Sequence, residues 1–329
     1  MTPSRLAIEV ETALAAADID TASPVERAQM LMEIAVGLQQ RPKTPVHLTA
    51  ALELYDKALA VCPAEETLLH ARILARKGTV LQALPGPGTD SLKLAIAAFE
   101  AAAAVIAAAG QPAELAELEM NRGLVLQALA GAGQARIGDA IAAHQRALKV
   151  FDRRRYPVEF AILQNNLATA FLSIPASDEK AQLREALAVR AFEEALQAVN
   201  LVDHPAEYAM LQNNLGNALQ YAATSHGIAN NLRALEAYDE ALKVRTPETA
   251  PLEYANTIAN KANCLCNLPD DAADPEAGNR ANLARARDCY ETARFIFEAH
   301  GDLEKAGIVA GVLAELDAAL GAPARGREG

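Results

Sequence analysis

The chain has 329 residues, a formal net charge of −12 and 51% hydrophobic residues, of which few are aromatic. This acidic balance argues against nucleic acid as a partner, because phosphate groups call for a basic protein face. Arg5, Glu9 and Glu11 interrupt the N-terminus before an apolar run can form. We therefore expect no secretory or transit segment, and a cytoplasmic protein.

A Pro-x-Glu motif recurs at intervals of roughly 40 to 50 residues. Proline suits the first position of a helix, where its missing N–H leaves nothing unpaired, and a glutamate two residues later favours the positive helix end. In the first copy, Ser23 and Glu26 also have the spacing of a capping box. Each copy therefore predicts a helix start. The six copies begin at Pro24, Pro63, Pro112, Pro157, Pro205 and Pro251.

Two helices are predicted in each copy. Apolar and small residues follow the start at helical spacing, as with Leu163, Leu167 and Phe171. After a polar or Gly/Pro break, a second helix carries a ring that fills the gap between the two helices, while small residues let the backbones approach. The sequence thus predicts an all-α solenoid of about six helix pairs over residues 24–300. The rings are Tyr55, Phe99, His144, Phe192, Tyr238 and Tyr290.

Further helices are predicted at both ends. One lies within residues 1–23 and one within 301–321, each expected to cover an end of the stack, and residues 322–329 are expected to be a disordered tail. The Ala-rich run from Leu94 to Ala109 falls on a predicted second helix and is shorter than a membrane span. We interpret that run as buried packing, and expect no membrane partner.

The pattern resembles the tetratricopeptide repeat. In the fifth copy, Asn214 to Ala218 and Leu235 to Leu242 match the consensus of that family nearly letter for letter. The period exceeds the roughly 34 residues of the standard repeat. The Gln-Asn-Asn runs at 164–166 and 212–214 are similar to a longer bacterial variant and to the repeats of kinesin light chains. The resemblance implies a right-handed α-α superhelix whose first helices line a concave groove.

No metal, cofactor or catalytic site is expected. Cys264 and Cys266 lie two residues apart, so on a helix they point in opposed directions and cannot grip one ion together. Cys289 could approach one of them, but a cytoplasmic chain favours reduced, buried thiols. The glycines at 86–88 and 131–133 lack the continuation of a phosphate loop. No nucleophile signature is visible either.

One basic cluster stands out in this acidic chain. Cations are favoured at a helix C-terminus, and the cluster is interpreted as such an end followed by a solvated loop. A docking site for an acidic partner is the alternative. The cluster comprises Arg146, Lys149, Arg153, Arg154 and Arg155.

Asparagine recurs in register along the first helices, in two sets. In tetratricopeptide proteins the first column chiefly hydrogen-bonds the backbone between neighbouring units, so the resemblance implies a structural role. That column is Asn121, Asn166, Asn214 and Asn260. The second set is Asn165, Thr169, Asn213, Asn217 and Asn263.

The second set is the predicted peptide-binding site. Its members are spaced i to i+4 on the first helices, the face that lines the groove in tetratricopeptide arrays. Amides both donate and accept, and can therefore pair with the backbone of an extended peptide whatever its side chains. As exposed groove amides, they are expected to contribute little to the stability of the stack.

These features favour a non-enzymatic scaffold that binds an extended segment of a partner protein or peptide in the groove. One alternative is an accessory or assembly factor, or a chaperone, that engages a folded enzyme, including a metalloenzyme, through its edges and loops. An enzyme is the third reading. The fold does not specify the partner, so its identity is left open.

Overall fold

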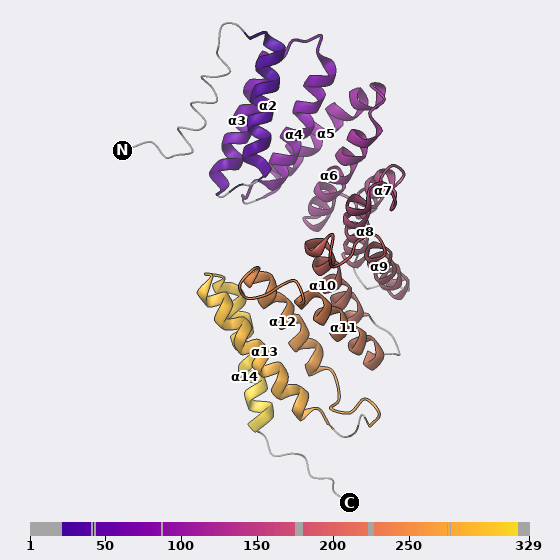
Figure 1. Cartoon of the computed structure of the whole chain (residues 1–329), viewed down its shortest axis with the longest axis vertical. Coiled ribbons are helices and arrows are strands. Elements are labelled where there is room, and N and C mark those ends of the chain that lie inside the picture. Colours follow the sequence, from indigo (N-terminus) through magenta and orange to yellow (C-terminus); the bar gives the residue numbers. More distant parts are fainter. Residues whose placement is uncertain are drawn as a thin grey trace, which may run out of the picture. The chain divides into compact units, whose positions relative to one another are not determined.

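The computed structural model describes residues 22–40, 42, 44–86, 88–174, 180–222, 227–274, 276 and 278–321. Within these residues the regular structure consists of helices and no strand, which confirms the all-α prediction (Figure 1). The chain divides into two compact units, residues 1–152 and 153–329. Residues 1–21, where most of the expected N-terminal helix lies, and the tail at 322–329 are outside the described residues.

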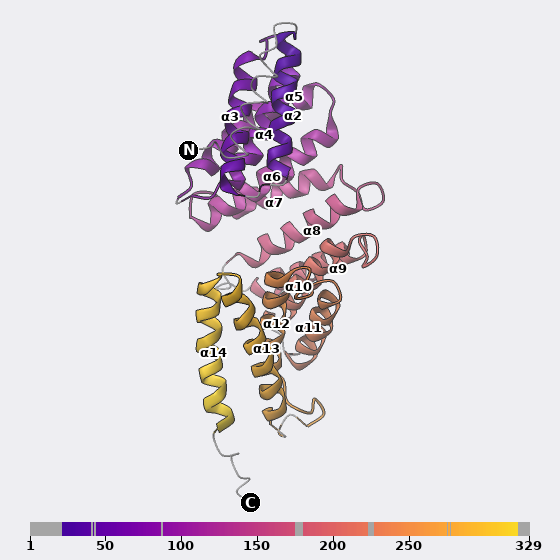
Figure 2. The same ribbon diagram turned by 60° about the vertical axis from the view of Figure 1, so that its left-hand side comes forward.

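The described residues of unit 1 form a stack of three helix pairs. The first helix of each pair packs most closely on the second helix of the same pair, with which it forms an antiparallel hairpin, and successive hairpins stack on one another (Figures 1 and 2). The helices are α2 (Pro24–Gln40), α3 (Pro45–Val61), α4 (Thr67–Ala83), α5 (Asp90–Ala108), α6 (Pro112–Gly131) and α7 (Ile137–Leu148).

In unit 2, the part of the chain that the structure describes contains three more pairs and one further helix. The last helix packs on α13, and its inner residues join the core formed with α12 and α13. The helices are α8 (Pro157–Leu172), α9 (Ala181–Leu196), α10 (Pro205–Tyr221), α11 (Gly227–Leu242), α12 (Pro251–Cys266), α13 (Arg280–Ala299) and α14 (Leu303–Gly321).

Five of the six Pro-x-Glu copies coincide with a helix start, and the copy at Pro63 does not. There the backbone N–H of Glu66 donates to the carbonyl of Pro63 at 3.0 Å, which closes a turn, and α4 begins only at Thr67. The predicted capping box at α2 is confirmed. Ser23 N–H donates to Glu26 Oε2 at 2.8 Å, and Glu26 N–H donates to Ser23 Oγ at 3.3 Å.

Small residues and rings face each other within the pairs, as predicted. A Cβ atom added to Gly216 would lie 2.6 Å from the ring of Tyr238, and one added to Gly78 would lie 2.7 Å from the ring of Phe99. Contacts this short do not occur without displacement, so each glycine makes room for the ring of its partner helix. The side chains of Tyr55, Phe99, His144 and Tyr238 are fully buried.

Helix α5 carries the Ala-rich run. Among the helices of the described residues, it alone is long and apolar enough to cross a membrane by length and composition. It packs between α4 and α6 in the stack, and its inner face, including Ala95, Phe99 and Ile106, is buried. Only 28% of its most apolar window is buried, and Leu94 is 59% exposed. The expected burial therefore holds for one face of the helix and not for the other.

Helix α14 matches α12 at an offset of 51 positions. Its buried residues Ala306, Val309, Leu313 and Leu316 correspond to Ala255, Ile258, Ala262 and Leu265 in α12. At the same offset, the exposed small residues of α14 align in sequence with a row of asparagines. Gly307, Gly311, Ala314 and Ala318 stand where α12 and its C-cap carry Asn256, Asn260, Asn263 and Asn267.

Candidate functional site

The asparagines of the first helices in unit 2 form a continuous ladder of side-chain hydrogen bonds. Asn260 on α12 donates from Nδ2 to Oδ1 of Asn213 on α10 at 3.2 Å, and Asn213 donates to its neighbour Asn214 at 3.2 Å. Asn214 then donates to Asn165 on α8 at 2.8 Å, and Asn165 donates to Asn166 at 3.3 Å. Five amides thus connect three first helices.

The ladder corrects the division of the asparagines into two sets. Asn213 is only 8% exposed and bonded on both sides, so it is not an exposed groove amide. The amide of Asn165 is likewise engaged between helices. The column of Asn166, Asn214 and Asn260 bonds to other side-chain amides, and not to backbone as the resemblance implied. The reason is that adjacent asparagines at 165–166 and 213–214 offer an amide acceptor to the helix that follows.

The other members of the second set have different surroundings. Thr169 Oγ donates to the carbonyl of Asn166 within its own helix at 3.0 Å. Asn217 Oδ1 accepts from the hydroxyl of Tyr238 at 2.7 Å, and burial raises the pKa of that hydroxyl, which therefore stays protonated and donates. Asn263 Nδ2 donates to Tyr221 Oη at 2.9 Å.

An apolar pocket of about 300 Å³ opens beside Asn217. It lies between the C-terminal ends of α8 and α10 and the start of α9. Phe171, Leu172 and Ile174 line it from the α8 side, and Ala218 and Tyr221 from α10. We call it the α8–α10 pocket. Ala181, Arg184 and Glu185 of α9 complete its lining.

Asn217 lines the α8–α10 pocket, and Asn263 lies beside it, bonded to the lining residue Tyr221. We call these two residues the rim, and they offer one donor and one acceptor. Asn217 uses Oδ1 for Tyr238, so its Nδ2 has no partner among the described residues. Asn263 uses Nδ2 for Tyr221, so its Oδ1 has none in that part of the chain. Both side chains are half-buried. A peptide group needs such a pair, because it carries one N–H and one C=O.

The sequence pattern did not predict that aromatic and aliphatic side chains line a pocket here. Phe171 lies on the apolar face that predicts the first helix, while Leu172 and Tyr221 are the last residues of their helices and are 40% and 69% exposed. An exposed tyrosine at a helix end, four residues after Asn217, was the available signal.

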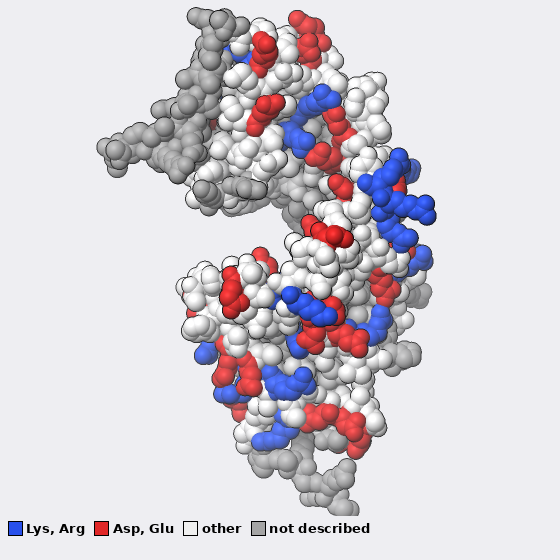
Figure 3. Space-filling model, in the orientation of Figure 1, with Lys and Arg blue, Asp and Glu red and all other residues white. Residues whose placement is uncertain are grey.

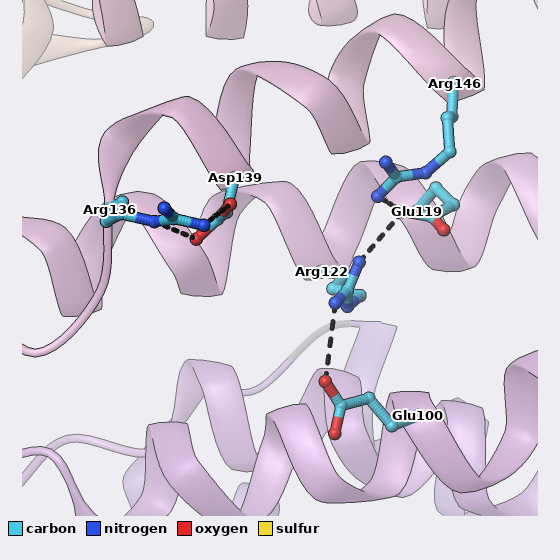
Figure 4. A network of polar contacts seen from close by, with 6 residues as sticks. All are labelled: Glu100, Glu119, Arg122, Arg136, Asp139 and Arg146. Atoms are coloured by element: carbon cyan, nitrogen blue, oxygen red, sulfur yellow. Dashed lines mark hydrogen bonds and ion pairs between the residues drawn. The ribbon is translucent and has the colours of Figure 1, made fainter.

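Charged side chains brace the helices of unit 1. Arg122 on α6 pairs with Glu100 on α5 at 3.4 Å and with Glu119 at 3.5 Å, and Arg146 on α7 donates to Glu119 at 2.8 Å (Figure 4). Arg146, a member of the basic cluster, is thus held against its own hairpin. On the face drawn in Figure 3, both signs of charge occur on each unit.

The cysteines are free thiols. Cys264 is buried and donates from Sγ to the carbonyl of Asn231 at 3.1 Å, and burial raises the pKa of the thiol to about 12. Within the described ranges, no three His, Cys, Asp or Glu side chains are grouped so that they could hold a metal ion.

Comparisons with known proteins add the following. No protein-family model matches the chain. A search of curated proteins finds no match either. Among solved structures, the chain is similar to a Rap protein complexed with competence and sporulation factor, with 13% identity, a TM-score of 0.41, and coverage of 97% of this chain and 89% of that one. It is also similar to a tetratricopeptide repeat protein from Parabacteroides merdae, with 12% identity, a TM-score of 0.38, and coverage of 86% and 98%.

The fold assignment comes from the helices themselves. Successive helix hairpins stack in each unit, and a small residue of the first helix faces a ring of the second. The described helices therefore form an all-α stack of helix hairpins, the architecture that the sequence pattern predicted.

Proposed function

We propose that this protein is an interaction scaffold, and that the first-helix face of unit 2 binds an extended segment of a partner protein. One apolar side chain of the segment occupies the α8–α10 pocket. Asn217 donates to a backbone carbonyl of the segment, and Asn263 accepts from a backbone N–H. This assignment keeps two members of the predicted peptide-binding set and gives Asn165 and Asn213 a supporting role.

The observation that carries the proposal is the combination of an apolar pocket with unpaired amide groups on its rim. Binding sites are typically concave and apolar, with a few polar groups that fix the orientation of the ligand. Here the lining of Phe171, Leu172 and Tyr221 supplies the apolar surface. The free Nδ2 of Asn217 and Oδ1 of Asn263 supply the polar groups.

The asparagine ladder supports the proposal by fixing the spacing of the helices. Asn217 and Asn263 belong to different helices, α10 and α12, and Asn260 donates to Asn213 between the same two helices. The ladder bond lies one turn from both rim residues. It therefore holds the donor and the acceptor at a constant separation before a ligand arrives, which lowers the cost of binding.

Replacing Asn217 by Ala is expected to weaken binding about fivefold, because one hydrogen bond worth about 1 kcal/mol is lost. The hydroxyl of Tyr238 can still donate to Gln220 Oε1 at 2.9 Å, so the stack should keep its melting temperature. The measurement is a titration by fluorescence anisotropy with peptides selected against the whole chain from a random display library.

The matched control is Gln134→Ala, which removes an exposed amide from unit 1 and should leave peptide affinity unchanged. Selection of peptides that bind the Asn217→Ala variant as tightly as the parent would count against the proposed site. So would a selection that yields no peptide with an apolar residue in a fixed position.

A further inference from the structure

A second pocket lies wholly within unit 1. It has a volume of about 260 Å³ and opens between α4 and α6. Its floor is apolar and comes mainly from Phe99, Ile106 and Leu118, which are all buried. This volume falls just below the range of roughly 300 to 1,000 Å³ that suits drug-sized ligands. The pocket is therefore matched to a smaller molecule.

Two ion pairs stand on its wall. Arg72 on α4 holds Glu114 on α6 in a bidentate contact, with Nε–Oε2 at 2.8 Å and Nη2–Oε1 at 2.6 Å. One turn along, Arg76 donates from Nη1 to Glu117 Oε1 at 2.6 Å. The Arg72 guanidinium lowers the pKa of Glu114, so that carboxylate stays charged. The wall thus carries two positive and two negative groups and has no net charge.

These pairs are able to accept a ligand. Their side chains are 33 to 43% exposed, and pairs of this kind contribute little to stability, so they open at small cost. Each guanidinium also keeps N–H groups that its glutamate does not use. A ligand carboxylate can therefore bind the arginines while a ligand ammonium binds the glutamates.

Asn121 adds a free amide to the same pocket. It stands in the column of Asn214 and Asn260, which donate to Asn165 and Asn213 of the preceding first helix. On α4, the first helix that precedes α6, the position equivalent to Asn165 and Asn213 is occupied by Ala75, whose side chain has no oxygen. Asn121 consequently has no hydrogen-bond partner among the described residues, and both its donor and its acceptor are available to a ligand.

We infer that this pocket binds a small zwitterion with an apolar side chain, of the class of a free aliphatic or aromatic α-amino acid. The ligand carboxylate lies against Arg72 and Arg76, its ammonium against Glu114 and Glu117, and its side chain on the apolar floor. A ligand with only a carboxylate leaves the two glutamates without a partner, and a ligand with only an ammonium leaves the two arginines without one. This site is independent of the peptide site proposed for unit 2.

The test is calorimetric titration of the full chain with four forms of leucine. These are leucine itself, N-acetyl-leucine with only the carboxylate, leucinamide with only the ammonium, and N-acetyl-leucinamide with neither. A parallel phenylalanine series checks the side chain. Leucine or phenylalanine is expected to bind roughly tenfold more tightly than any of its three derivatives. The Asn217→Ala variant should bind them as the parent does.

Two charge variants supply a readout that a purely structural role would not move. Glu117→Gln leaves the wall with a net positive charge, so the affinity for N-acetyl-leucine should rise severalfold relative to the affinity for leucine. Arg76→Gln leaves the wall with a net negative charge, so the affinity for leucinamide should rise relative to the affinity for leucine. Far-UV circular dichroism establishes that both variants fold, and the four-ligand series on the parent protein stands without them.

The inference is overturned if none of the eight compounds binds at millimolar concentration. It is also overturned if the uncharged derivative binds as tightly as the amino acid. In either case the two ion pairs only brace α4 against α6.

Discussion

The Asn213→Ala variant is expected to lose about 2 kcal/mol of unfolding free energy in unit 2, which corresponds to a fall of about 4–8 °C in melting temperature. Asn213 is 8% exposed and links α12 to α10 through the ladder. Its removal leaves Asn260 without an acceptor and Asn214 without its donor. Unpaired polar groups inside a protein cost more than the net value of the bond they lose. Thermal unfolding followed by circular dichroism measures the change.

Asn217→Ala is the matched comparison, because the same side chain is removed one helical turn away. It should change the melting temperature little and weaken peptide binding, whereas Asn213→Ala should act chiefly on stability. Equal melting temperatures for the two variants would show that the ladder does not contribute to the stack. A double-mutant cycle on Asn213 and Asn260 then isolates the energy of the bond between them.

Acid is expected to lower the stability of the third helix pair, α6 and α7, through His144. This side chain is fully buried in the ring position between α6 and α7, and neither ring nitrogen has a hydrogen-bond partner in the described part of the chain. Burial lowers its pKa from 6.5 to about 4, although Glu119 acts in the opposite direction. The unfolded chain therefore binds a proton more readily than the folded one. The contribution of His144 to stability is complete above pH 6.5 and is lost as the pH falls towards 4.

The size of the loss follows from the two pKa values. It is about 2 kcal/mol at pH 5 and about 3 kcal/mol at pH 4. The variant His144→Phe should remove this part of the acid sensitivity, because Phe99 and Phe192 fill the same place in other pairs. Hydrogen exchange of the amides of α6 and α7 at pH 7 and pH 5 gives the local opening free energy.

The control for this experiment is His70→Gln, which replaces an exposed histidine in the same unit. That variant should lose protection between pH 7 and pH 5 as the parent does. If His144→Phe also loses protection to the same degree as the parent, the acid response has another origin.

The sequence anticipated the fold because proline and ring positions are local signals. A proline sets the first turn of a helix, and the ring at Tyr238 requires a small residue such as Gly216 on the helix before it. The failure at Pro63 is also local. A proline can open a turn as readily as a helix, and the turn at Glu66 took precedence.

The candidate sites were harder to predict, because depth within a stack depends on neighbouring helices. Asn213 and Asn217 are four residues apart and share a helix face, yet the first is buried beneath α12 and the second opens to a pocket. Periodicity identifies the face and not the depth. The ion pairs of the unit 1 pocket are easier to recognise in the sequence, because their partners are spaced by nearly one repeat. Arg72 and Glu114 are 42 positions apart, and Arg76 and Glu117 are 41 apart, which is close to one repeat period.

The small residues of α14 determine how long a captured segment can be. Where α12 and its C-cap carry four asparagines, α14 carries Gly307, Gly311, Ala314 and Ala318, which have no side-chain amide. The row of side-chain amides on the first helices of unit 2 therefore extends from α8 to α12 and does not continue on α14. Packed helices lie about 10 Å apart, so this distance is about 20 Å, and an extended chain covers it with about six residues. Under the proposed function, we therefore expect the recognition element in the partner to be a hexapeptide-sized motif, and residues added beyond its end near α14 should leave the affinity unchanged.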